Sequence, residues 1–246
     1  MCTVSWIRSE SGCSVFCNRD ERGTRLPARP PARMTRHGVA YLAPIDGDRG
    51  GTWIAVNENG LCLTLLNYYR TEGDVEADGA RSRGLLLADL ADAAGPADAV
   101  GRLETGDLAP YNPFVLLAIA SAGEPFRFQW DGKASGSGVL SSADSLQSTS
   151  SFSPDEVNQA RREWFTERVR LAGGMSEAAL DGFHRSVHPA GPAYGPCMFR
   201  LEASTVSYTR VRIDALRVSM TYEPVCAETR SFGPAHEVEL GRVSRV

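Results

Sequence analysis

The N-terminal stretch that decides the fold reads MCTVSWIRSESGCSVFCNRDE over residues 1–21. Its β-branched, aromatic and polar residues predict a strand over 3–8 and an antiparallel partner over 13–18. The polar tetrad at 9–12 has the composition of a tight turn. A hairpin of this length returns its last residues to the neighbourhood of Cys2.

Strands further along the chain come in hairpins. They are expected at 51–56 and 61–66 around an Asn-Gly turn, at 114–120 and 126–130, and as two or three strands between 198 and 222. The segment with Pro27, Pro30 and Pro31 is expected to stay unpaired, because proline fixes φ and lacks a donor. The serine-rich stretch 133–153 is typical of a flexible surface loop.

Helices cluster in the middle of the chain. Apolar periodicity predicts them at 82–94, 96–103, 154–172 and 176–186. Ser153 is expected to cap the third helix, with Glu156 completing a capping box. Hairpins together with clustered helices favour antiparallel sheets covered by helices over a doubly wound parallel fold.

Length and charge narrow the possibilities further. A chain of 246 residues suits one substantial core, so residues 1–246 are expected to form a single domain. A net charge of −4 argues against binding nucleic acid. Apolar runs stay short of the roughly 18 residues that a membrane helix needs, so we expect a soluble protein that does not insert into membranes.

Cysteine usage predicts a reducing compartment. Six cysteines are far fewer than a disulfide scaffold would have, and no signal-peptide pattern is present, so we expect free thiols in the cytoplasm. The cysteines are Cys2, Cys13, Cys17, Cys62, Cys197 and Cys226. Among them, Cys2 stands out because it directly follows the initiator methionine.

Removal of Met1, which is normal before a small residue, would leave Cys2 with both a thiol and a free α-amine. The thiolate is a nucleophile, and an amine with a pKa of roughly 8 can take the thiol proton without a histidine. The alternative interpretation is that Cys2 is a small buried residue at the start of a strand.

The polar tetrad Asn18-Arg19-Asp20-Glu21 follows the second predicted strand. A carboxylate there can hold the α-ammonium, and a guanidinium can orient a substrate carbonyl or carboxylate. Asn67, after the apolar run 61–66, can donate to an oxyanion. Both features also fit ordinary turns.

Other candidates are less specific. Trp53 and Tyr68 can line an apolar substrate pocket or belong to the core. His184 and His188 are spaced i, i+4, but no third ligand accompanies them, so we expect structural histidines, with no metal and no cofactor.

Several motifs occur in an order that is shared with a known family. They are Met1-Cys2-Thr3, Asn18-Arg19-Asp20-Glu21, Arg29-Pro30, Gly50-Gly51-Thr52-Trp53, Leu63-Thr64 with Asn67, Ser82-Arg83-Gly84 and Tyr111-Asn112-Pro113-Phe114. Over roughly residues 1–120 the chain therefore resembles the NRDE family, also called the transport and Golgi organisation family. That family is similar in turn to cysteine-dependent N-terminal nucleophile hydrolases such as bile salt hydrolase and penicillin V acylase. The resemblance implies an α+β fold, a four-layer αββα sandwich.

The resemblance also implies roles for single residues. Cys2 falls on the nucleophile, and Asn67 on an asparagine that helps to form the oxyanion hole. The arginine and aspartate of an Arg-Asn-x-Asp pattern fall on Asn18 and Glu21 without gaps, whereas a shift by one residue favours Arg19. Ser142 occupies the position of a second asparagine, where a hydroxyl can donate one hydrogen bond to the substrate.

The function implied is hydrolysis of a non-peptide amide in a small molecule, or the related transfer of its acyl group. A different class remains as the alternative, a non-catalytic carrier of haem or a lipid-like ligand, because eukaryotic members are linked to haem and lipid handling. A third possibility is a protein that retains the fold without activity. The sequence leaves the oligomeric state open.

Overall fold

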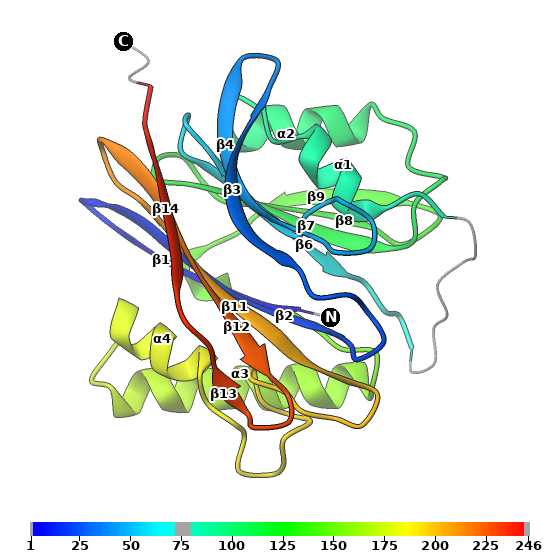
Figure 1. Cartoon of the computed structure of the whole chain (residues 1–246), viewed down its shortest axis with the longest axis vertical. Coiled ribbons are helices and arrows are strands. Elements are labelled where there is room, and N and C mark those ends of the chain that lie inside the picture. The colour runs from blue at the N-terminus through cyan, green and yellow to red at the C-terminus, as the bar shows by residue number, and fades with distance from the viewer. Residues whose placement is uncertain (1, 72–79, 244–246) are drawn as a thin grey trace.

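The structure, a computed structural model, describes residues 2–71 and 80–243. Two antiparallel sheets stack face to face, and a pair of helices covers the outer face of each sheet (Figure 1). This is the four-layer αββα sandwich expected of the chain. None of the helices in the described residues is long and apolar enough to cross a membrane.

The first sheet holds both the start and the end of the described chain. Its strands, in spatial order, are β10 (Leu146–Thr149), β1 (Cys2–Ser9), β2 (Gly12–Arg22), β11 (Ala203–Ile213), β12 (Arg217–Cys226) and β13 (Ser231–Phe232), with β14 (His236–Gly241) also pairing with β12. Its outer face carries α3 (Pro154–Leu171) and α4 (Glu177–His184).

The second sheet is built from consecutive hairpins. Its order is β3 (Arg29–Arg36), β4 (Val39–Ile45), β5 (Ile54–Asn57), β6 (Leu61–Asn67), β7 (Phe114–Ala120), β8 (Phe126–Trp130) and β9 (Ser135–Val139). Its outer face carries α1 (Arg83–Asp89) and α2 (Pro96–Glu104). A short 3-10 helix, Ser142–Asp144, leads from β9 into β10 and so from the second sheet into the first.

The side chains of strand β1 alternate between the core and the helix layer. Val4 and Trp6 point into the core between the sheets, whereas Thr3 and Ser5 point to the helix layer. Successive side chains of a strand alternate in this way. Both faces of β1 are covered, so its small polar residues are buried and find partners on the helices.

Two glycines fix the approach of α1 to the second sheet. A Cβ on Gly51 would lie 2.3 Å from the carbonyl carbon of Gly84, so neither side can carry a side chain there. The backbone N–H of Thr52 donates to the Gly84 carbonyl at 3.0 Å. The strand expected at 51–56 therefore begins only at Ile54, because the preceding residues pair with the helix start instead.

The expectation of an unpaired segment at the prolines is wrong. Pro30 and Pro31 lie within β3, which pairs with β4 through a register shift between Arg29 and Ala32. Because β3 is at the edge of the sheet, one side of the strand needs no ladder hydrogen bonds, and proline is tolerated there.

The serine-rich segment is not a simple loop either. It supplies β9 and β10, one at an edge of each sheet. All five residues of β9 are exposed, so the strand lacks the apolar alternation that would reveal it in the sequence.

The start of α3 also differs from the prediction. The helix begins at Pro154, but Ser153 has a φ of 35° and makes no side-chain capping bond. Glu156 accepts instead from the Tyr194 hydroxyl at 3.3 Å, so the expected capping box does not form.

Candidate active site

Cys2 opens β1 between two partner strands. In the register, Cys2 lies opposite Arg19 of β2 on one side and Thr149 of β10 on the other. Its side chain is buried in the core between the sheets. The prediction that the hairpin brings the tetrad back to Cys2 is confirmed. Met1, on which the expectation of methionine removal rests, lies outside the described residues.

Strand alternation divides the tetrad between the two faces of β2. Arg19 and Glu21 share the face of Cys2, and they contact each other with Arg19 Nη2 3.2 Å from Glu21 Oε2. Asn18 and Asp20 point to the helix layer. Asn18 Nδ2 donates to the carbonyl oxygens of His184 and Pro196 at 2.9 and 2.8 Å, which anchors α4 and the loop after it.

The guanidinium of Arg19 is held between an aromatic ring and a carboxylate. It lies 4.2 Å from the centre of the Trp53 ring, within the range of a cation–π interaction. Arg19 Nη2 also donates to Asp46 Oδ2. Trp53 is buried, and its ring packs against the guanidinium of Arg19. Arg19 in turn lies on the same face of the first sheet as Cys2.

Asp46 is a site residue that the sequence does not single out. Besides Arg19, it binds Arg25 Nη2 at 2.7 Å and accepts from the backbone N–H of Arg49 at 2.8 Å. Burial alone would raise the pKa of Asp46, but the Arg49 amide and the two guanidinium groups lower it overall. The only sequence signal is a carboxylate in a turn between two apolar runs, which is common in loops.

Asp20 is a completely buried carboxylate on the helix side. Its Oδ1 accepts from the Thr205 hydroxyl at 2.7 Å, and its Oδ2 lies 3.6 Å from Arg161 Nη2. Burial raises the pKa of Asp20, and the opposing charge of Arg161 offsets this only in part. Its negative charge also acts on the Cys2 thiol, so Asp20 is electrostatically part of the Cys2 environment.

Arg161 is a second residue that sequence reasoning missed. It is 1% exposed, although an arginine within a polar helical pattern is normally expected at the surface. Its Nη1 donates to Thr3 Oγ1 at 3.0 Å and its Nε to the Gly195 carbonyl at 3.1 Å. It therefore fastens α3 to the strand that begins with Cys2.

The thiol of Cys2 differs from its neighbours in acidity. A hydrogen bond with the Cys17 thiol lowers the pKa of Cys2 by more than burial raises it. Of the two nearby side-chain charges, that of Asp20 raises this pKa and that of Arg19 lowers it. The same hydrogen bond, together with burial, raises the pKa of Cys17. The arrangement thus favours the thiolate at Cys2, which is the nucleophilic form.

Asn67 ends β6, the strand that packs against β1 across the core. Its Nδ2 donates to the Tyr69 hydroxyl at 3.1 Å. Tyr69 in turn packs against Met198 and Ala203, at the start of β11. The amide is therefore joined to the end of the first sheet that also carries Cys2 and Asp20.

Tyr68 and Ser142 have different surroundings. Tyr68 packs against the core between the sheets and lines a cavity of about 170 Å³ together with Tyr69. Ser142 begins the 3-10 helix between the sheets, but its side chain is outside the part of the chain described. Residues 72–79, which come shortly after Tyr69, also lie outside that part.

His184 is a structural histidine with both ring nitrogens engaged. Nε2 lies 2.8 Å from the Ser5 hydroxyl, and Nδ1 lies 2.9 Å from Asn18 Oδ1. Because Asn18 Oδ1 can only accept, Nδ1 carries the proton and Nε2 accepts from Ser5. Burial lowers the pKa of His184 to about 3. No cluster of three metal-ligating side chains occurs within the described residues.

The fold places the chain in a structural class, the N-terminal nucleophile hydrolase fold that amidases and acylases share. An N-acylethanolamine-hydrolyzing acid amidase ortholog from Caenorhabditis elegans superimposes with a TM-score of 0.63 at 15% identity, covering 85% of this chain and 92% of that chain. Penicillin V acylase from Agrobacterium tumefaciens gives a TM-score of 0.57 at 15% identity, covering 91% of this chain and 83% of that chain.

The family is narrower than this structural class. The chain belongs to the Transport and Golgi organisation 2 family, whose model matches residues 1–165. No curated protein sequence matches the chain. The family match therefore covers the motifs around Cys2, whereas the similarity to the amidase and the acylase concerns the fold alone.

Proposed function

We propose that the protein is a cysteine N-terminal nucleophile hydrolase that cleaves a non-peptide amide after removal of Met1. The observation that carries the proposal is the environment of Cys2. Its buried thiol has a lowered pKa, lies opposite Arg19 in the sheet and stands at the first position of β1. The fold shared with an amidase and an acylase supports the same chemistry.

In the proposed reaction, the α-amine of Cys2 takes the thiol proton, and Sγ attacks the carbonyl carbon of the amide. The C–N bond of the tetrahedral intermediate then breaks, and the amine leaves with the proton from the α-ammonium. Water attacks the resulting thioester, the α-amine takes its proton, and the carboxylic acid is released as the thiol re-forms. An amine or alcohol in place of water would make the protein an acyl transferase.

The surrounding residues receive separate roles. Asp20, with its charge acting on Cys2, would hold the α-ammonium, and Glu21 is the alternative carboxylate of the tetrad. Arg19, held in place by Trp53 and Asp46, would contact the substrate. Asn67 would donate to the oxyanion, an interaction worth about 3–4 kcal/mol in other hydrolases.

Intact mass and a panel of acyl amides test the proposal. We expect the purified protein to lack Met1. The Cys2→Ala substitution should lower turnover of the acyl amides by at least about a thousandfold, because it removes the nucleophile. Cys62→Ala is the matched control, since it removes another buried thiol of the same core without touching the reacting group.

A retained methionine would exclude the α-amine mechanism. Equal turnover by the parent and Cys2→Ala would exclude Cys2 as the nucleophile. Absence of turnover combined with saturable haem or lipid binding, measured by titration of the same preparation, would instead favour the carrier.

A further inference from the structure

We propose that the cavity beside Cys2 binds an anionic oxygen group of the substrate through Arg127 and Arg162. The substrate class would then be acyl amides that carry a carboxylate or sulfonate. This inference rests on the proposed function, because it names the substrate class of the same site.

The cavity is one residue away from the proposed nucleophile, through the strand partner of Cys2. It has a volume of about 170 Å³ and is enclosed by the end of β6, by β7 and β8, and by β10 and α3. Thr149 lines it and is the register partner of Cys2. Side chains that face each other in an antiparallel pair have Cβ atoms about 4.5–5.5 Å apart. A group bound in the cavity therefore lies within one substrate length of Sγ.

The charge in the cavity wall is one-sided. Arg127 comes from β8 and Arg162 from α3, and the described residues place no aspartate or glutamate in the lining. Arg19, Arg161 and Arg185 elsewhere in the molecule form ion pairs. Within the described residues, no carboxylate pairs with either cavity arginine. Arg127 is also half-buried, and its Nη2 donates to the neutral Gln129 Oε1, so its charge has a hydrogen-bond partner but no carboxylate. A buried charge without a counter-charge is costly. Guanidinium groups bind carboxylates and related anions through paired N–H donors.

A buried hydroxyl provides a second, independent observation. Thr149 is 8% exposed, and its Oγ1 is buried without a hydrogen-bond partner in the structure. Buried polar atoms are usually paired. The hydroxyls of Thr64 and Ser207 are also buried without a partner, but the Thr149 hydroxyl belongs to a residue that lines the cavity, so a bound ligand can supply its missing partner. Thr149 can donate to the same oxygen group that the arginines attract.

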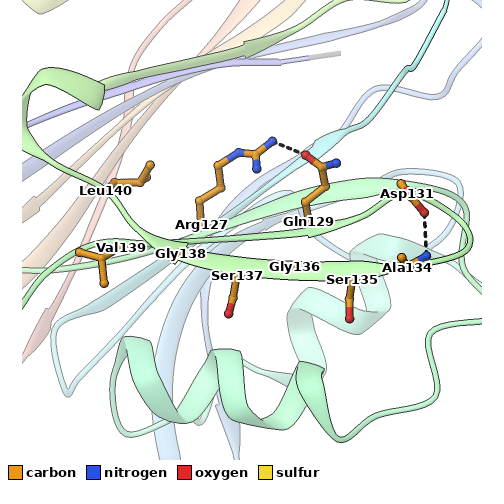
Figure 2. Close-up of a pocket in the computed structure, with 10 residues that line it drawn as sticks. All are labelled: Arg127, Gln129, Asp131, Ala134, Ser135, Gly136, Ser137, Gly138, Val139 and Leu140. Atoms are coloured by element: carbon orange, nitrogen blue, oxygen red, sulfur yellow. Dashed lines mark hydrogen bonds between the residues drawn. The ribbon is translucent and has the colours of Figure 1, made fainter.

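A trough along the β8–β9 hairpin shares one lining residue with this cavity. It has a volume of about 390 Å³, and Arg127 lines both hollows. Figure 2 shows the side chains of Arg127 and Gln129 on the opposite side of the hairpin from Ser135 and Ser137.

Two glycines keep this trough open. Gly138 pairs with Arg127 and Gly136 with Gln129, and a Cβ on either glycine would meet nothing within 4 Å. The alternating Ser-Gly sequence of β9 thus leaves this strand without side chains on the face that carries Arg127 and Gln129.

Ligand binding to the Cys2→Ala protein tests the inference without relying on turnover. The probes are N-lauroylglycine, N-lauroyltaurine and the neutral N-lauroylethanolamine, which share one acyl chain, and the measurement is titration calorimetry. We expect the anionic probes to bind about tenfold to a hundredfold tighter, as hydrogen bonds to charged groups of roughly 1.5–3 kcal/mol imply. The glycine and taurine arms separate a carboxylate site from a sulfonate site.

Variants that remove one arginine charge test which residues cause the preference for anionic probes. Arg127→Gln and Arg162→Gln should each lower the preference at least about fivefold and leave binding of the neutral probe unchanged. Arg33→Gln is the matched control, because it removes the same charge from an exposed position on β3, at the opposite edge of the sheet from β9. Gly138→Val should weaken all three probes by filling the trough.

The outcomes separate this inference from the proposed function. Equal binding of charged and neutral probes, or a preference that survives both arginine variants, would overturn the anion site. Thermal melting checks that each variant is folded, and the exposed Arg162 provides a test even where Arg127→Gln destabilises the chain. Arginine-dependent anion binding without any turnover in the parent would overturn the proposed hydrolase and leave the anion site standing.

Discussion

At the scale of single residues, the interior thiols differ because of their immediate partners. Burial disfavours a thiolate, and it raises the pKa of Cys13 and Cys197 to about 12. Cys2 is buried as well, but Cys17 donates to its sulfur and Arg19 faces it across the strand pair. A neighbouring proton donor therefore outweighs desolvation at this one position of the core.

The Cys17→Ala variant tests that account. Loss of the donated hydrogen bond removes the main stabilisation of the Cys2 thiolate, so the pKa of Cys2 should rise. Alkylation of the Cys2 peptide by iodoacetamide, followed by mass spectrometry across pH, should show the midpoint moving to higher pH. Cys62→Ala should leave the midpoint in place, and an unchanged midpoint in Cys17→Ala would contradict the assigned cause.

At the scale of secondary structure elements, α3 is fastened to the first sheet by one buried side chain. Arg161 reaches Thr3 of β1 and the Thr149 carbonyl of β10, and it forms the ion pair with Asp20 of β2. Three strands thus share one guanidinium. The helix holds in place the strand end at which Cys2 lies.

Removal of this guanidinium should be strongly destabilising. We expect Arg161→Met to lower the free energy of unfolding by about 3–5 kcal/mol, because it leaves the Asp20 carboxylate buried without its cation. Adding Asp20→Asn should recover part of the loss, since the remaining group is neutral. Urea denaturation measures both effects.

Arg170→Met, at an exposed position in the last turn of the same helix, serves as the control and should cost less than about 1 kcal/mol. Similar losses for the two arginine variants would show that Arg161 contributes no more than a surface residue.

At the scale of the whole molecule, His184 couples folding to pH. Its pKa is about 3 in the folded protein and about 6.5 when unperturbed. The unfolded chain therefore binds a proton below about pH 6.5 that the native state excludes until about pH 3. Stability should fall as the pH decreases through this range, with a slope of at most about 1.4 kcal/mol per pH unit from this group.

Comparison with His184→Gln isolates the effect. Between pH 7 and pH 5, the parent should lose about 2 kcal/mol more of its unfolding free energy than the variant, which has no titrating ring. The comparison concerns slopes, because Gln also changes the bonds to Ser5 and Asn18 at every pH. Parallel stability profiles would mean that His184 is accessible to protons in the native state.

Much of this architecture follows from local patterns. The hairpin at residues 3–18, the Asn-Gly turn and the strands at 114–120 and 126–130 occur as predicted, because alternation and turn residues are local properties. The edge strands β3 and β9 escaped prediction, since proline or glycine and serine are tolerated where a strand has only one partner.

The sequence by itself determined the hairpin that returns the Asn18–Glu21 tetrad to Cys2, and with it the family and the candidate nucleophile. Only the tertiary structure decided which face each tetrad member occupies and which distant residues complete the site. Asp46 meets Arg19 across 27 residues and Arg161 meets Thr3 across 158. Such contacts depend on how the sheets and helices stack, and no local pattern in the chain encodes that stacking directly.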